Sequence, residues 1–249
     1  MSTLYSSRLV PTTASATTAA SGYPATNVLL QSLGAPWRAT GTGQTDVIID
    51  LGAAKTVRGV AVSDVNFTGC TIASSADNTT YTDRATPTYS ADRFGRIRGI
   101  AALNTSARYW RIRIASGTPA DSLGYWRIGA VYLFGATASI ASPQYGFSID
   151  TEHAEARDKL LNGREAVAAV GNRFDRITGS FKVASVSPGS SFAIGSLLQA
   201  MRAGVVWLDM GVSVRPWWTW PLIHNAATDR EAMPNYDISD IKLDAREVV

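Results

Sequence analysis

The stretch from residue 73 to residue 114 constrains the fold most strongly, because it carries two strand signals. Near its start, Asp77-Asn78 tolerates left-handed backbone angles and suits a tight turn. The residues before this pair are small or hydroxylated, and Thr79 to Thr82 after it are good strand formers. Near its end, apolar and basic residues alternate as Trp110, Arg111, Ile112, Arg113 and Ile114. The stretch therefore predicts a hairpin followed by a strand with one apolar face.

Five segments in a fixed order resemble the discoidin family, the coagulation-factor C-domains of the galactose-binding-like type. That family has a Ser-x-Asp-Gly-x-x-Trp hairpin and then Ala-Arg-Tyr-aromatic-Arg-Ile. Here Ser75, Asp77, Tyr81 and residues 107–112 fill those places, with Asn78 for glycine and tyrosine for tryptophan. The other segments are G-Y-P-A-T-N-V-L-L at 22–30, Trp37-Arg38, I-I-D-L-G at 48–52 and I-G-A-V-Y-L-F-G at 128–135. The resemblance covers roughly residues 10–136 and implies a β-sandwich jelly roll, which we expect to form a first domain of residues 1–137.

Within this region we expect consecutive strands at 47–51 and 57–62, with a turn at 52–54. Trp37 matches a core aromatic of the family. The segment 2–10 is interpreted as a frayed terminus, the alternative being an arm that pairs with a neighbouring molecule. The one cysteine, Cys70, forbids an internal disulfide and is expected to be a buried, inert thiol.

In discoidin-like domains, loops at one end of the barrel carry the ligand-binding side chains. The matching loops here are 63–67 and 90–98. Their candidate glycan-binding residues are Asp64, Asn66, Phe67, Arg93, Phe94 and Arg96. An aromatic face with fixed hydrogen-bonding groups can hold a sugar, although solvated loop tips or subunit contacts are the commoner role. Some family members bind a structural calcium. No dense acidic loop here requires one, and no cofactor or metal is predicted.

The second half, residues 138–249, begins with a linker of small residues at 137–143. Strands are expected at 145–150, 164–170, 173–185, 205–210, 215–223 and 236–249, with a hairpin turn at Gly171-Asn172. A helix is expected near 191–203, capped by Ser190-Ser191 and ended by Gly204. The prediction is a small β-sandwich with one helix across it.

This order of elements resembles the ring-forming domain of siphophage tail-tube and distal-tail proteins, in which six copies close a ring. The resemblance implies a homo-oligomer, a hexameric ring, that contacts tube and hub proteins. It also implies a place in the virion after assembly in the host cytoplasm.

Three tryptophans stand close together in R-P-W-W-T-W-P-L at 215–222. Such a cluster is costly to leave in water. We interpret Arg215, Trp217, Trp218 and Trp220 as a subunit interface. Core packing on a bulged strand and carbohydrate stacking are the alternatives.

Other function classes find little support. The net charge is only +3 and no long basic run occurs, so a nucleic-acid partner is not expected. No apolar run approaches the length that would cross a bilayer. His153 lacks the further partners of a metal site, and His224 is a strand-end residue. Neither a catalytic motif nor a carboxylate pair can be named, so the chain is predicted not to be an enzyme.

We therefore expect a structural protein of a phage-like tail tip, with an outward discoidin-like domain that braces neighbours or touches host glycan weakly. The alternative is a carbohydrate-binding module or adhesin without catalytic activity. A tail-associated depolymerase would be a third class.

Overall fold

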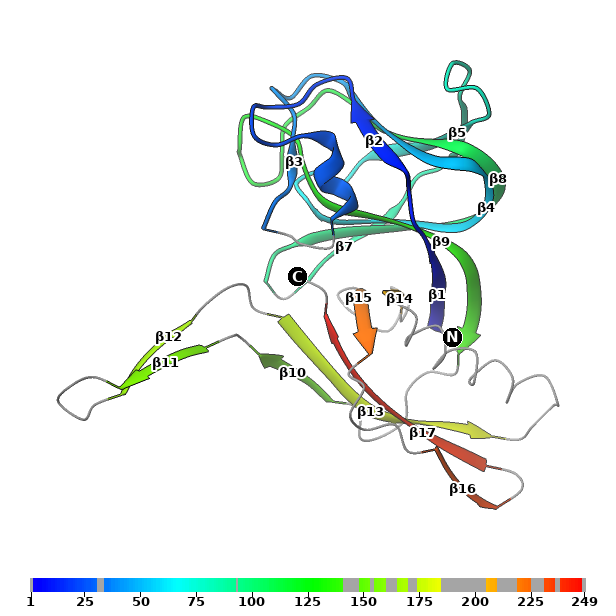
Figure 1. The fold of residues 1–249 in the computed structure, drawn as a ribbon, viewed down its shortest axis with the longest axis vertical. Helices are drawn as coiled ribbons and strands as arrows, with labels where there is room; N and C mark the ends of the chain where they lie inside the picture. The colour runs from blue at the N-terminus through cyan, green and yellow to red at the C-terminus, as the bar shows by residue number, and fades with distance from the viewer. Residues whose placement is uncertain are drawn as a thin grey trace.

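The protein is described by a computed structural model that covers residues 2–30, 34–92, 94–140, 148–152, 155–159, 165–169, 174–184, 205–209, 219–224, 231–235 and 238–247. The described residues form strands and one short 3-10 helix, so the all-β prediction is confirmed (Figure 1). The elements of the first half are β1 (Ser2–Leu9), β2 (Thr13–Ala16), η1 (Ala25–Leu29), β3 (Trp37–Arg38), β4 (Thr45–Val65), β5 (Cys70–Ser75), β6 (Thr82–Ala85), β7 (Thr88–Ala91), β8 (Ile97–Ile114) and β9 (Arg127–Ile140). Those of the second half are β10 (Ser148–Glu152), β11 (Glu155–Lys159), β12 (Glu165–Ala169), β13 (Phe174–Ala184), β14 (Val206–Asp209), β15 (Thr219–His224), β16 (Glu231–Asn235) and β17 (Ile238–Glu247).

Two long antiparallel strands, β4 and β8, run through both layers of a jelly roll in the first half of the chain (Figure 1). In one layer, residues 47–50 of β4 pair with β2 and residues 109–114 of β8 pair with β5. β6 continues that layer beyond β5. The other parts of β4 and β8 pair with β9 and β7 to form the second layer. The pairing of β4 with β8 shifts register at three places, where irregularities let a strand bend.

The two strands expected at 47–51 and 57–62 are one bent strand in the structure, so this prediction was wrong. Gly52 lies at the bend with φ of +75°, a backbone angle that glycine adopts without strain. Asp50 accepts a hydrogen bond from the Gly52 amide at 2.7 Å and fixes the bend. The residues at 52–54 do change the direction of the chain, as their composition predicts. They form a corner between the two layers, and the strand continues beyond them.

The predicted hairpin at Asp77-Asn78 is confirmed, with Asn78 in the left-handed region at φ of +63°. Its return strand begins later than expected, at Thr82. The reason is local, because the amides of Thr79 and Thr80 donate to the Asp77 carboxylate at 2.9 and 3.0 Å. Side-chain hydrogen bonds thus extend the turn through residues that favour strands.

The core of the jelly roll lies between its two layers and is built from alternating strand residues, as the sequence predicts. Its largest fully buried members are Trp37, Trp110, Ile49, Ile72, Ile112, Ile114 and Ile128, and Trp126 and Phe67 belong to the same core. The expectation that Trp37 is a core aromatic is confirmed. Cys70 is buried and free, and burial raises the pKa of its thiol to about 11, so the thiolate that would react is scarce.

The N-terminal strand β1 joins the two halves of the chain. It pairs with β9 along one edge and with β14 along the other, so one continuous antiparallel path of strands runs from the second half into the first. The expected frayed terminus is therefore wrong, since both edges of β1 are hydrogen-bonded within the chain and Tyr5 is buried. The predicted linker at 137–143 starts within β9, because residues 136–140 pair with β1.

The described strands of the second half continue this sheet in the order β14, β15, β17, β13 and β10, with β16 beside β17 (Figure 1). The hairpin expected between 164–170 and 173–185 is wrong, because β12 pairs with β11 and β13 pairs with β10 and β17. The predicted helix near 191–203 lies outside the described residues. Within the described part of the chain, no helix is long and apolar enough to cross a membrane.

Candidate functional site

The loop at 63–67 holds the neighbouring loop at 115–126 in place. Asn66 is 1% exposed, and its amide nitrogen donates to Asp121 at 3.0 Å and to the carbonyl of Tyr125 at 2.9 Å. Its amide oxygen accepts from the backbone of Arg127 at 2.8 Å. Phe67 is 4% exposed and packs edge-on against Trp126. In this structure both side chains support the loops and present little surface to a ligand.

Asp64 belongs to an ion network on the same side of the module. It has a left-handed backbone angle and pairs with Arg127 at 3.2 Å, and Arg127 also contacts Asp121 at 3.7 Å. Burial raises the pKa of the Asp64 carboxyl above its usual value, although the charges of Arg127 and Arg96 oppose this rise. Arg127 thus links two carboxylates from loops that are distant in sequence.

The second predicted loop is organised by Asp92, which sequence reasoning did not single out. Its carboxylate accepts from Arg96 at 2.7 Å and from Arg98 at 2.8 Å, and the side chains of Asp92 and Arg98 are 2% and 1% exposed. Burial alone would raise the pKa of Asp92, but the charges and hydrogen bonds of both arginines outweigh it and the pKa lies below its ordinary value. The Arg96 guanidinium also lies 4.9 Å from the centre of the Phe94 ring. Arg93 lies outside the described residues.

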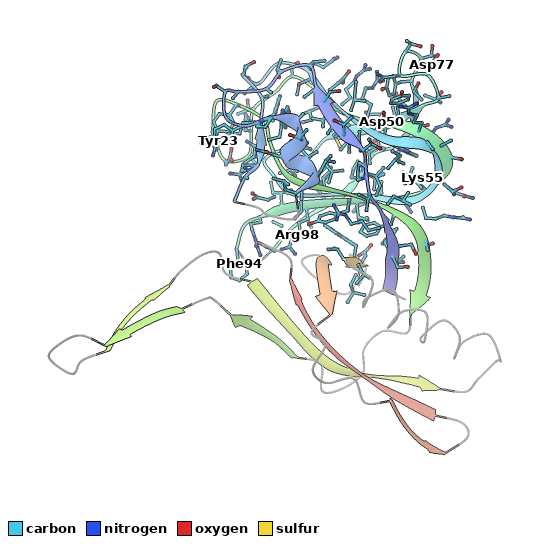
Figure 2. The ribbon with its side chains drawn as sticks, viewed as in Figure 1. Tyr23, Asp50, Lys55, Asp77, Phe94 and Arg98 are labelled. Carbon is cyan, nitrogen blue, oxygen red and sulfur yellow. The ribbon has the colours of Figure 1, made fainter. Side chains whose placement is uncertain are left out.

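The two predicted loops are close enough to interact, since the charges of Arg96 and Asp92 act on Asp64. Phe94 and Arg98 lie on the side of the first module that faces the second (Figure 2). Tyr23 lies on a different side of the first module, farther from the second (Figure 2).

A stack of one arginine and two tyrosines lies next to the Asp64 network. The guanidinium of Arg38 is 3.8 Å from the centre of the Tyr23 ring and 5.2 Å from that of Tyr125. All three side chains are half-buried. Arg38 is held in place because β3 pairs with β9, which sets Arg38 opposite Arg127. Tyr125 is held because its carbonyl accepts from Asn66. We call Tyr23, Arg38 and Tyr125 the arginine–tyrosine cluster.

This cluster was missed in the sequence because its members stand far apart, at 23, 38 and 125. Tyr23 and Arg38 did belong to segments that matched the family, but only as markers of the fold. The available signal was Arg38 next to the core residue Trp37, together with Tyr23 in the segment at 22–30. The pairing of β3 with β9 brings them together.

The residues predicted as a subunit interface are only partly described. Trp220 lies on β15 opposite Leu208 of β14, whereas Arg215, Trp217 and Trp218 lie outside the described residues. Among the residues that the structure describes, no group of three or more histidine, cysteine, aspartate or glutamate side chains could hold a metal ion.

The solved structures that resemble the first half of the chain include carbohydrate-binding modules. No protein-family model matches the sequence. No curated protein matches it either. Among solved structures, chitosan-binding module 1 of a chitosanase/glucanase from Paenibacillus sp. IK-5 is 22% identical, with a TM-score of 0.43 over 52% of this chain and 99% of that one. The family 32 module of AlyQ in complex with 4,5-unsaturated mannuronic acid is 23% identical, with a TM-score of 0.42 over 52% and 99%. The family 32 module of Clostridium perfringens NanJ in complex with galactose is 18% identical, with a TM-score of 0.42 over 54% and 99%.

Proposed function

We propose that the first module is a non-catalytic glycan-binding domain and that the arginine–tyrosine cluster is its contact surface. One observation supports this proposal above the others. Arg38 and two tyrosine rings form an ordered, half-buried surface. The hydrogen bond from Asn66 to Tyr125 and the ion pair of Arg127 with Asp64 fix the backbone next to it. Aromatic rings that stack on sugar faces, next to fixed hydrogen-bonding groups, are the usual means by which proteins hold carbohydrate.

The predicted loop residues have a supporting place in this proposal. Asp64 and Asn66 position Arg127 and Tyr125, and Phe67 packs beneath the loop through Trp126. Because ordered side chains lose little entropy on binding, a surface braced in this way favours affinity.

A glycan array followed by isothermal titration calorimetry on the full chain tests this proposal. Tyr23→Ala and Tyr125→Ala should each weaken binding of the glycan that the array selects by about tenfold, because each removes a stacking face. Tyr109→Ala is a matched control, since Tyr109 also stacks with an arginine, Arg108, but stands on another surface of the module. An array without any saturable binder, or equal affinity in all four proteins, would refute the proposal.

A second candidate function is the structural one, a ring-forming component of a phage-like tail tip that binds tube and hub proteins. The observation that favours it is β1, which fixes the first module to the second by pairing with both β9 and β14. A rigid joint of this kind suits a part that must hold its place in an assembly. Light scattering after size exclusion, with negative-stain imaging, should show a hexameric ring. A monomer at every concentration that also binds no tail protein would contradict it.

A further inference from the structure

Among the described residues, three arginines lie over the rings of half-buried tyrosines. They are Arg38 over Tyr23 at 3.8 Å, Arg111 over Tyr81 at 4.1 Å and Arg108 over Tyr109 at 4.8 Å. All three guanidinium groups lie within 5 Å of a tyrosine ring centre, but they differ in whether a carboxylate also contacts them.

Arg108 and Arg111 have carboxylate partners. Arg108 pairs with Asp50 at 2.8 Å, and Arg111 lies 3.9 Å from Asp46. No described carboxylate pairs with Arg38. The Nε atoms of Arg38 and Arg111 are both buried without a partner among the described residues, so the carboxylate is the difference between them. A guanidinium has five N–H donors in one plane. In Arg38 the Tyr23 and Tyr125 ring centres lie 3.8 and 5.2 Å from the guanidinium carbon, and its terminal nitrogens, unlike the buried Nε, remain for another molecule.

No carboxylate in the described part of the chain neutralises the charge of Arg38 either. Arg127 is the cation nearest to it along the paired strands, and Asp64 and Asp121 compensate Arg127 at 3.2 and 3.7 Å. The positive charge of Arg38 therefore remains to attract an anion. A single uncompensated cation suits a ligand with one negative charge per contact, whereas nucleic acids are held by several phosphate contacts.

We propose that Arg38 binds the carboxylate of an acidic sugar, a uronate residue, whose ring lies against Tyr23 or Tyr125. The planar carboxylate matches the edge of the guanidinium, which can donate two parallel hydrogen bonds to it. The tyrosine rings keep the guanidinium in one orientation and shield it partly from water, which strengthens the ion pair. This inference rests on the proposed function, because it names the class of glycan that the same cluster takes.

Titration calorimetry of the full chain with two matched ligands tests the inference. The ligands are an oligogalacturonate and the same oligosaccharide with its carboxyl groups reduced to hydroxymethyl groups. The acidic ligand should bind about tenfold to a hundredfold more tightly, the ratio expected for a charge-assisted hydrogen bond. Its affinity should also fall as salt is raised, and that measurement needs no variant.

Variants then assign the effect to Arg38. Arg38→Gln should remove the preference for the acidic ligand, and Arg38→Lys should restore only part of it, because lysine lacks the planar fork. Arg58→Gln is the control, since Arg58 is an exposed arginine on β4 outside the cluster. Thermal melts followed by circular dichroism show whether each variant is folded.

The possible results distinguish a failure of this inference alone from a failure of the proposed function. If both oligosaccharides bind equally and Tyr23→Ala weakens both, the glycan site stands and the inference is overturned. If a galactan sulfate ester binds as tightly as the uronate, the carboxylate assignment is overturned in favour of any single oxyanion. If no oligosaccharide or array glycan binds, the proposed function fails and the inference fails with it.

Discussion

The sheet formed by β9, β4 and β8 has two buried faces, and they differ in what covers them. Val131 and Leu133 of β9 point into the jelly roll, where strands of the same module enclose them. Tyr132 and Phe134 point the other way and pack with Tyr5 of β1 and Trp207 of β14. The inner face is thus enclosed within one module, and the outer face is covered by the start of the chain and by its second half.

The polar content of the two faces differs as well. On the outer face, Ser63, Tyr132 and Trp207 each have a buried polar atom that finds no hydrogen-bond partner among the described residues. The Arg98–Asp92 pair lies along the same strand face as Ile100. The outer face therefore combines apolar packing with polar groups, as contacts between modules commonly do. The comparison teaches that a continuous apolar run such as 130–134 marks a strand buried on both sides.

The largest effect that would test this comparison is expected from Trp207→Ala. It should lower the free energy of unfolding by about 3–5 kcal/mol, since it leaves a large cavity in the outer core. Urea denaturation should then show two transitions, because the second half separates from an intact jelly roll. Trp37→Ala, in the inner core, is the counterpart and should unfold the jelly roll itself. A single unchanged transition for Trp207→Ala would show that the outer face contributes no stability.

A somewhat smaller effect is expected from Asp92→Asn, which leaves the Arg98 charge buried without its partner. The expected loss is about 3 kcal/mol at pH 7. Because the folded pKa of Asp92 is lowered, its stabilising contribution is present above the unfolded pKa of about 3.9 and is lost as pH falls through the lower folded value. The difference from wild type should therefore be constant above about pH 5 and shrink below about pH 4.

Asp50→Asn is the control, because its pair with Arg108 is far more open to solvent and should contribute little. Chemical denaturation across pH measures both variants. If the two variants lose the same stability, the buried Asp92–Arg98 pair stabilises the fold no more than the exposed Asp50–Arg108 pair does.

The smallest effect is expected from Gly59→Ala on β4. A Cβ at this position would overlap the ring of Tyr5, which is buried and cannot move away easily. The cost should be about 1–3 kcal/mol, and thermal melting measures it. Gly69→Ala, where a Cβ would meet no atom within 4 Å, should change stability far less. Equal melting temperatures for both variants would show that β1 does not press on β4.

Much of the first module could be predicted from its sequence, because local patterns record local structure. The alternation from Trp110 to Ile114 and the Asp77-Asn78 turn both hold in the structure. The bend at Gly52 could not be distinguished from a turn between strands, because both need the same glycine. The pairing of β1 with β14 joins residues about two hundred positions apart, and no local pattern records such a pairing.

The candidate site also combines features that local sequence predicts with features that depend on contacts between distant residues. The family resemblance selected Asp64 and Asn66 as ligand-binding candidates, but their burial and hydrogen bonds depend on Arg127 and Tyr125, which the sequence of one loop does not include. The arginine–tyrosine cluster depends on the register of β3 against β9, set by Trp37 opposite Ile128. Whether a polar residue supports a site or faces its ligand is decided by tertiary contacts.

The position of β1 has a consequence for synthesis of the chain. β1 leaves the ribosome before β9 and β14. Its pairing with β9 is complete only when residue 140 has emerged, and its pairing with β14 only when residue 209 has emerged. Since domains tend to fold as units in the order of translation, the jelly roll can close while the edge of β1 that faces β14 is still open. For that interval the nascent chain carries an unpaired strand edge, which is a site where another polypeptide could add before the chain's own strand arrives.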